Sequence, residues 1–292
     1  MRLRTLPLSL AGITAGTLLA VADYRVKPLT VLFLALTTVS LQILSNLCNE
    51  LGDSQHGTDR ADREGIRYAL QDGLMTEGTL KALIAGAVVA CVLFGSALVY
   101  CAFGSLFSLD ALMFLLLGLA AIVAAMRYTL GRNPYGYRGL GDLYVFVFFG
   151  LVTVLGAYFL CAGELPSWKL LLPASAVGLL SVGVLNVNNL RDIRSDAATR
   201  TTVAIRLGVR GARIYQTLLL AGGWACALAY CLLRVFDPWH YLFVLTLPLF
   251  VLHVRGVWTR EGGALDPMLP LLVLSSFGFA LLYGLGFVSY LL

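Results

Sequence analysis

Two short stretches of the chain place carboxylate and amide side chains at the ends of long apolar runs. The first, NLCNELGDSQHGTD, carries Asn49 and Asp53, and the second, NVNNLRDIRSD, carries Asn188, Asp192 and Asp196. Four residues turn a helix through about 400°, so the second set forms one stripe that advances only about 40° per step. Carboxylate and amide oxygens are ligands for hard divalent cations such as Mg²⁺. The spacing therefore predicts two oxygen-rich stripes that could hold such a cation.

The two stretches also repeat each other along the chain. Asn49 and Asp53 are each matched by the same residue type 139 positions later. The match is imperfect, because Gly57 stands where it would place Asp196, and Asp59 lies two residues further on. Membrane proteins built from duplicated halves show such internal symmetry. Within a single domain, 1–292, we expect pseudo-repeat halves at about 1–141 and 142–266 and a last helix at 267–291.

Composition indicates the environment of these stripes. The chain has 292 residues, of which 59% are hydrophobic and 13% charged, and its mean hydropathy of +0.84 is far from that of an ordinary water-soluble domain. A helix needs about 20 apolar residues to cross a bilayer. The sequence therefore predicts an all-α, polytopic membrane protein, a bundle of about nine transmembrane helices, at 6–22, 29–50, 79–101, 108–129, 142–163, 168–190, 212–233, 239–257 and 267–291.

Basic residues predict the orientation of the bundle, because Lys and Arg near short loops stay on the cytoplasmic side. With a cytoplasmic N-terminus, 17 of the 21 Lys and Arg residues fall in inner loops, which leaves Arg25, Lys27, Lys169 and Arg234 outside. The formal charge of +5 then reflects topology and requires no nucleic-acid partner. Both stretches lie at the cytoplasmic ends, so we expect an active-site cavity that faces the cytoplasm.

Arginines near the stripes extend the predicted chemistry. An ionised aspartate in a membrane helix is costly and needs partners, and guanidinium groups bind phosphate oxygens bidentately. Mg²⁺ commonly binds through one or two carboxylates together with substrate phosphates. The sequence therefore predicts a clamp for a diphosphate whose lipid tail lies in the apolar bundle. The candidate diphosphate or acceptor contacts are Arg63, Arg67, Arg127, Arg191, Arg200 and Tyr128, and the arginines interpreted as setting topology are Arg210, Arg213, Arg255 and Arg260.

Several motifs, in this order along the chain, resemble the UbiA superfamily of intramembrane prenyltransferases. NELGD with Asp59 beyond it, NNLRDIRSD and RTTVAIRLG look like its two aspartate-rich motifs and the loop that follows. The stretches MRLRTLPLSLAG, LQILSNLCNELGDSQHGTDRADREGIR and RYTLGRNPYGYRGLGDLYVFVFFG are similar to its 1,4-dihydroxy-2-naphthoate polyprenyltransferase branch. The resemblance extends from the first helix to about Gly208.

The resemblance implies an enzyme of menaquinone biosynthesis in the cytoplasmic membrane of a bacterium. Such enzymes bind a polyprenyl diphosphate through Mg²⁺, ionise it to an allylic cation and let an aromatic ring attack. In this branch the ring is 1,4-dihydroxy-2-naphthoate, which loses its carboxylate as CO₂. The implied catalytic residues are Asp53, Asp192, Asp196, Asn49 and Asn188. The implied metal ligands are Asn49, Asp53, Asp59, Asp192 and Asp196.

The chain departs from the family pattern at two positions. The usual first motif spaces its aspartates by four, whereas Asp53 and Asp59 are six apart, so the resemblance supports Asp53 more strongly than Asp59 as a direct ligand. The branch usually has Asp where this chain has Glu50. Glutamate keeps the charge at that position and lengthens its reach.

Other functions remain open at this stage. The same mechanism could serve another acceptor, such as 4-hydroxybenzoate or haem. A secondary transporter would also show helical repeats, but it predicts polar residues along the whole crossing, and here the outer half of every span lacks a charged path. Charged residues are also common where helices emerge into water, although the repeated motif favours a site. The sequence does not determine the oligomeric state.

Overall fold

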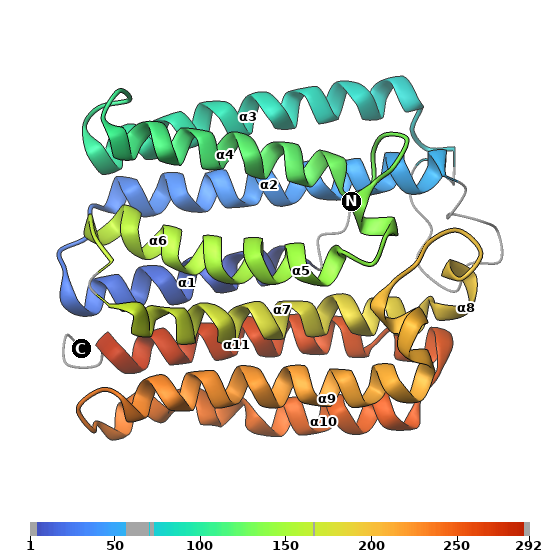
Figure 1. Ribbon diagram of the computed structural model, residues 1–292. Coiled ribbons are helices and arrows are strands. Elements are labelled where there is room, and N and C mark those ends of the chain that lie inside the picture. Colours follow the sequence, from blue (N-terminus) through green and yellow to red (C-terminus); the bar gives the residue numbers. More distant parts are fainter. Residues whose placement is uncertain (1–4, 57–69, 71–72, 166, 289–292) are drawn as a thin grey trace.

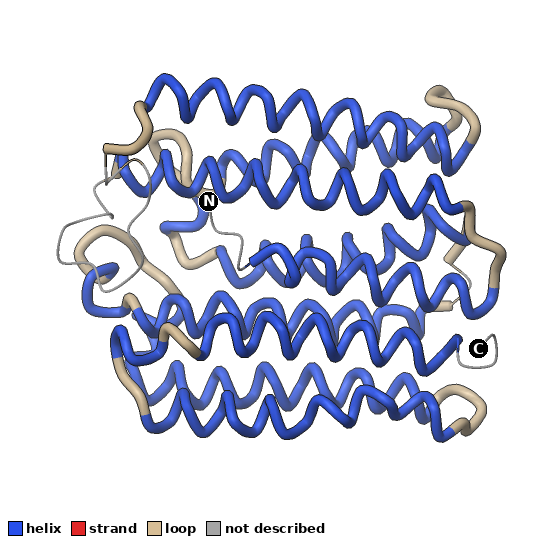
Figure 2. Tube along the Cα trace, turned by 180° about the vertical axis from the view of Figure 1, so that it is seen from behind, coloured by secondary structure: helices blue, strands red, loops and turns tan. Residues whose placement is uncertain are grey.

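The computed structural model describes residues 5–56, 70, 73–165 and 167–288. Over these residues it contains nine helical spans that are long and apolar enough to cross a membrane, as predicted. The chain is therefore an integral membrane protein. Figure 1 shows the spans lying side by side in one bundle, with α8 and its neighbouring connections at one end, and Figure 2 shows the same arrangement from behind.

The described residues form sixteen helical elements, of which η2 and α8 lie outside the nine spans. In order they are α1 (Leu6–Asp23), α2 (Pro28–Gln55), α3 (Glu77–Phe103), α4 (Leu109–Arg127), η2 (Tyr135–Tyr137), α5 (Gly141–Val145), the π-helix η3 (Phe146–Val152), α6 (Thr153–Ala162), η4 (Trp168–Leu170), α7 (Leu171–Arg191), α8 (Ile193–Asp196), α9 (Val203–Leu232), η5 (Pro238–Thr246), α10 (Leu247–Thr259), η6 (Gly262–Leu265) and α11 (Met268–Val288).

Short polar residues and glycines define where the helices begin and end. Thr76, Ser108 and Thr202 each accept a hydrogen bond from the backbone N–H three residues further on, which caps α3, α4 and α9. α3 and α6 end at Gly104 and Gly163, both in the left-handed conformation that favours glycine. The local sequence thus fixes the limits of the apolar runs.

The seventh span begins earlier than predicted. The expectation was a start near residue 212, whereas α9 begins at Val203. Residues 203–211 are amphipathic, because Arg206 and Arg210 interrupt their apolar residues, so they do not form an apolar run. They are nevertheless helical. Their first part joins the rest of α9 through a kink at Gly208, whose φ of 67° is readily available only to glycine.

The central helix of the bundle is α7, which has the largest buried share of the nine spans described. It packs against α9 on one side and against η3 on another, while α1 packs against α6 and α11. Small residues allow these close approaches. A Cβ on Gly150 of η3 would lie 2.5 Å from the Cα of Gly178 on α7, and one on Gly16 of α1 would lie 2.3 Å from the carbonyl oxygen of Val154.

The bundle has a closed side and a hollow side. Between α9, η5 and α11, the rings of Trp224, Phe243 and Phe279 contact one another with centroids 5.0 to 5.3 Å apart. This side is filled by aromatic packing. The other side, formed mainly by α1 to α7 with the start of α11, contains the main cavity and an apolar groove beside it, so the fold leaves space next to the two motifs.

Candidate active site

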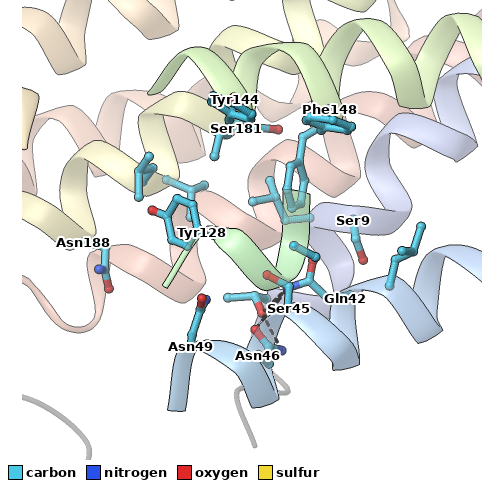
Figure 3. Close-up of a pocket in the computed structure, with 18 of the residues that line it drawn as sticks. Ser9, Gln42, Ser45, Asn46, Asn49, Tyr128, Tyr144, Phe148, Ser181 and Asn188 are labelled. Atoms are coloured by element: carbon cyan, nitrogen blue, oxygen red, sulfur yellow. Dashed lines mark hydrogen bonds between the residues drawn. The ribbon is translucent and has the colours of Figure 1, made fainter. Parts of the chain in front are cut away.

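The last turns of α2 carry the first motif to the cavity. Asn49 and Asp53 both line it, and Asp53 is only 2% exposed. Thr129, which follows α4, donates its hydroxyl proton toward the carbonyl oxygen of Cys48 at 2.8 Å and lies 3.3 Å from Oδ1 of Asn49. This contact positions the Asn49 amide. Figure 3 shows Asn49 and Asn188 coming from different helices toward the same space.

Asp53 is also held by residues from other parts of the chain. Tyr137 donates a hydrogen bond to its Oδ1 at 2.8 Å, and Nη1 of Arg200 lies 3.9 Å from the same oxygen. Arg200 also donates from Nη2 to Oδ2 of Asp196, and its guanidinium lies 5.8 Å from the centroid of the Tyr137 ring. Arg200 therefore connects the first motif to the second.

Arg200 remains a cation in this setting. Its burial acts to lower the pKa of the guanidinium, but the charges of Asp196 and Asp53 outweigh that effect and raise the pKa above its ordinary value. Arg200 also lines the cavity. A fixed positive charge in a cavity of low dielectric attracts an anion more strongly than it would in water. The geometry is thus suitable for binding phosphate.

The second motif differs from the predicted stripe. α7 ends at Arg191, Asp192 has a non-helical φ of −93° and ψ of 11°, and α8 is a separate short helix. The prediction of one continuous helix is therefore wrong at Asp192. Side chains of adjacent helical residues do not face each other, so the two-point contact of Arg191 with Asp192 accompanies the break. Backbone hydrogen bonds from Asp192 to Asn188 and from Asp196 to Asp192 still preserve the four-residue spacing.

Arg191 lies at the centre of a buried charged cluster. Its Nε and Nη2 donate to the two carboxylate oxygens of Asp192 at 2.8 and 2.7 Å. Nη1 donates to Asp266 at 2.8 Å, and Nη2 also donates to Oδ1 of Asn188 at 3.1 Å. The Arg191 side chain is 2% exposed, and it lines a different pocket from Asp53. The sequence predicts Arg191 as a diphosphate contact, but in the structure it does not line the main cavity. It lies on the other side of the cavity wall and neutralises the charge of Asp192.

The main cavity has a polar mouth and an apolar interior. Its volume is about 280 Å³. An apolar groove of about 320 Å³ lies beside it and is lined mostly by α2, α3, α4 and α6. The two share lining residues such as Leu41 and Val152, so they are contiguous. The polar and charged residues at the mouth are Asn49, Asp53, Asn188, Asn189 and Arg200.

Aromatic rings form one wall of the cavity. Tyr135 stacks on Tyr144 with centroids 3.8 Å apart, Tyr144 is nearly parallel to Phe148 at 6.1 Å, and Tyr128 meets Tyr135 edge-on. All four line the cavity, and Figure 3 shows Tyr128, Tyr144 and Phe148 around it. Burial raises the pKa of Tyr135, so its hydroxyl stays protonated and donates to the carbonyl oxygen of Ala124 at 2.7 Å. The wall is thus made of packed rings, and this hydrogen bond holds Tyr135 within it.

Several predicted residues lie elsewhere or outside the description. Arg127 is exposed and is not among the residues that line the cavity. Asp59, Arg63 and Arg67 fall outside the described residues. Asp192 and Asp196 are buried but do not line the cavity. They contact arginines instead.

The donors at the mouth fit a divalent cation that is bound mainly through phosphate. In the part of the chain that the structure describes, no three His, Cys, Asp or Glu side chains cluster as metal ligands. The cavity nevertheless collects oxygen atoms from Asp53, Asn49 and Asn188. These are hard donors, and Mg²⁺ keeps several positions for phosphate oxygens and water.

Two residues at or beside the site, Gln42 and Asp266, are not indicated by the motifs. Gln42 lines the cavity and donates to Thr5 at 3.1 Å and to Asn46 at 3.2 Å. It lies one helical turn before Asn46, on the face that also carries Asn49, so helical periodicity could have found it. Asp266 had no such signal, because it reaches Arg191 only through the tertiary fold.

Comparison with known proteins identifies the family. The sequence matches the model of the UbiA prenyltransferase family over residues 9–274. The chain belongs to this family. The UbiA match confirms the resemblance found in the motifs and the predicted prenyltransferase class, and it favours an enzyme over a transporter.

Individual UbiA relatives match nearly the whole chain. A 1,4-dihydroxy-2-naphthoate octaprenyltransferase of Escherichia coli (strain K12) is 42% identical over 288 residues, which cover 98% of this chain and 92% of that protein. The protein of the same name from Haemophilus influenzae is 41% identical over 292 residues, covering 98% and 93%. A UbiA homologue from Aeropyrum pernix K1 superposes with a TM-score of 0.75 over 100% of both chains, at 19% identity, which shows the shared fold.

Proposed function

We propose that this UbiA-family protein transfers a polyprenyl group from a polyprenyl diphosphate to 1,4-dihydroxy-2-naphthoate, with loss of CO₂, as a step of menaquinone biosynthesis. The names of its relatives support the acceptor and the prenyl donor. The observation that carries the proposal is the contiguity of a polar mouth, which contains Arg200, with an apolar groove. A diphosphate at the mouth would place its hydrocarbon tail in that groove.

Arg200 is the residue we assign to the leaving diphosphate. When the bond between the allylic carbon and the diphosphate oxygen breaks, negative charge develops on the diphosphate. A fixed guanidinium at the mouth stabilises that charge without reorganisation. Asp196 holds Arg200 in place through its Oδ2, so we assign Asp196 a positioning role. Arg191 and Asp192 stabilise the end of α7 and the orientation of Asn188.

Asp53, Asn49 and Asn188 are the residues we assign to a divalent cation, which we propose to be Mg²⁺, with Asp59 as a further expected ligand. When bound there, the cation would neutralise the diphosphate and act as a Lewis acid on its oxygens. Tyr137 orients Asp53 by its hydrogen bond at 2.8 Å. The amide of Asn49 is oriented by Thr129.

The aromatic wall is suited to the acceptor. A flat naphthalene ring can stack on Tyr144 or Phe148, since aromatic rings favour offset stacking. The electron-rich faces of these rings also attract a cation, so the wall stabilises an allylic cation while the apolar lining excludes water. The acceptor ring then attacks the allylic carbon, a new C–C bond forms, and the ring carboxylate departs as CO₂.

We further propose that the mouth faces the cytoplasm and that the membrane is the cytoplasmic membrane of a bacterium. The distribution of Lys and Arg among the loops supports this orientation. The substrates would then arrive differently, with the soluble acceptor coming from the cytoplasm and the polyprenyl diphosphate from the bilayer.

The test is prenyl transfer by the purified protein in liposomes. The assay supplies a polyprenyl diphosphate with either 1,4-dihydroxy-2-naphthoate, labelled at the carboxyl carbon, or 4-hydroxybenzoate. We expect prenylated naphthoquinol together with labelled CO₂, loss of both on chelation with EDTA, and recovery with Mg²⁺. Product from 4-hydroxybenzoate alone would overturn the acceptor, and absence of product with any acceptor, from folded protein, would overturn the proposed function.

A further inference from the structure

A second pocket lies at the same end of the bundle, beyond the wall formed by the end of α7. It has a volume of about 190 Å³ and is lined by residues of α7, α8, α9 and the connection from α10 to α11. It shares no lining residue with the main cavity. Asn188 and Asn189 face the cavity, whereas Leu190 and Arg191 face this pocket. The two spaces are therefore separate sites.

The pocket is strongly basic. Its charged lining residues are Arg191, Arg194, Arg213, Arg260 and Glu261. Arg191 is already neutralised by Asp192 and Asp266, which leaves three arginines against one carboxylate. That carboxylate is shared, because Nη2 of Arg194 lies 3.9 Å from it and Nη2 of Arg213 lies 3.4 Å from it. Cations concentrated in one concave surface favour the binding of an anion.

One of these arginines is fixed before any ligand binds. Nε of Arg213 donates to the carbonyl oxygen of Val257 at 3.0 Å, and Nη2 donates to the carbonyl oxygen of Arg260 at 2.8 Å. The side chain is 15% exposed. A guanidinium whose plane is set in this way loses little conformational entropy when it binds an oxyanion. Arg194, in contrast, lines the pocket with a side chain that is 87% exposed.

The pocket opens beside exposed apolar residues of α9, a surface suited to contact with lipid. Val209, which lines the pocket, is exposed, and so are Ile214 and Leu218 further along α9. Nearby on α10, Trp258 exposes 43% of its surface while its Nε1 donates to Thr217 at 3.1 Å. Tryptophans of this kind concentrate at the level of the lipid headgroups. The position of Trp258 beside the pocket therefore favours a location at headgroup depth.

We propose that this pocket binds the phosphate group of an anionic phospholipid through Arg194, Arg213 and Arg260. Guanidinium groups donate paired hydrogen bonds to phosphate oxygens, and basic pockets between transmembrane helices recognise anionic headgroups. A headgroup anchored here leaves its acyl chains to lie along the exposed apolar face of α9. The proposal does not depend on the proposed prenyl transfer, because none of the three arginines lines the main cavity.

Native mass spectrometry of the full-length protein in detergent tests this site, with phosphatidylglycerol and phosphatidylcholine as probes. We expect the protein to retain phosphatidylglycerol preferentially. The double variant Arg194→Gln/Arg260→Gln should bind it roughly tenfold more weakly, because two cations near the headgroup are lost. Glu261→Gln should bind it more tightly, since Glu261 is the one carboxylate among the described residues that line the pocket.

A matched control separates the pocket from general surface charge. Arg210→Gln/Arg255→Gln removes two exposed arginines from the same end of α9 and α10, neither of which lines the pocket, and we expect it to bind phosphatidylglycerol like the unmodified protein. Equal losses in the two double variants, or equal retention of the two lipids, would overturn the proposal. Displacement of the lipid by millimolar inorganic phosphate would assign the pocket to free phosphate instead, whereas no displacement supports the lipid headgroup.

Discussion

The ends of α2 and α7 carry the same residue types but use them differently. α2 is continuous through Asp53, which lines the cavity beside Asn49. α7 breaks at Asp192, and neither Asp192 nor Asp196 lines the cavity. Each of these two carboxylates is bound to a buried arginine. The two similar motifs thus lie at the ends of two helices without having the same role.

The difference has an electrostatic cause. Removing one member of a buried ion pair leaves an uncompensated charge, which costs about 3–5 kcal/mol. At the end of α7, Asp192 forms an ion pair with Arg191, and Asp196 forms one with Arg200. At the α2 end, Asp53 itself lines the cavity, 3.9 Å from Nη1 of Arg200. The carboxylate of the first motif therefore faces the cavity, whereas those of the second motif hold arginines and leave Asn188 to face it.

The largest effect is expected from Asp53→Asn. This substitution removes a charged oxygen donor that lines the cavity, so kcat should fall on the order of 100-fold or more, with little loss of folded protein. Prenyl transfer in liposomes measures the rate. Asp110→Asn, an exposed aspartate at the start of α4, should leave the rate unchanged. If Asp192→Asn cost more than Asp53→Asn in kcat while remaining folded, the assigned roles of the two motifs would be reversed.

Arg200→Gln should combine a loss of activity with a loss of stability. The diphosphate loses its cation, so kcat/KM should fall by about 100-fold. Asp196 also loses its buried partner, which lowers the free energy of unfolding by about 3 kcal/mol. Thermal unfolding in detergent and the transfer assay measure the two effects.

Two variants check the Arg200 prediction. Arg127→Gln removes an exposed arginine outside the cavity and should change neither quantity appreciably. Adding Asp196→Asn to Arg200→Gln should recover part of the stability but none of the activity. Recovery of activity in the double variant would show that Arg200 only balances Asp196.

A smaller, purely structural effect is expected from Gly52→Ala. A Cβ at this position would lie 2.6 Å from the carbonyl oxygen of Thr129, so the backbone beside Asn49 must shift, at a cost of roughly 1–3 kcal/mol. Gly118→Ala on α4 is the matched control, because nothing lies within 4 Å of its added Cβ. Thermal unfolding should show a clear loss only for Gly52→Ala. An equal response at both positions would remove the evidence for tight packing at the α2 end.

The sequence predicts features that depend on local composition and periodicity. The nine spans follow from apolar runs limited by caps such as Ser108 and Gly104, and the Asn49–Asp53 face follows from helical spacing. The break at Asp192 could not be predicted in this way, because it accompanies contacts of Arg191 that include Asp266, 75 residues away. The role of a carboxylate thus depends on which distant side chain reaches it.

The smallest effect is expected from Tyr137→Phe, which tests how firmly Asp53 must be held. The substitution removes one hydrogen bond of 2.8 Å to Oδ1 and keeps the ring beside Arg200. A hydrogen bond to a charged group contributes about 1.5–3 kcal/mol, and part of this is regained from the remaining contacts of Asp53. We therefore expect kcat/KM to fall roughly tenfold, mainly through weaker binding of Mg²⁺, so that a higher Mg²⁺ concentration restores much of the rate. Tyr100→Phe, an exposed tyrosine near the end of α3, should show no such dependence. A loss that Mg²⁺ does not restore would mean that Tyr137 contacts a substrate directly, and the oxygen-presenting end of the site would then extend beyond α2.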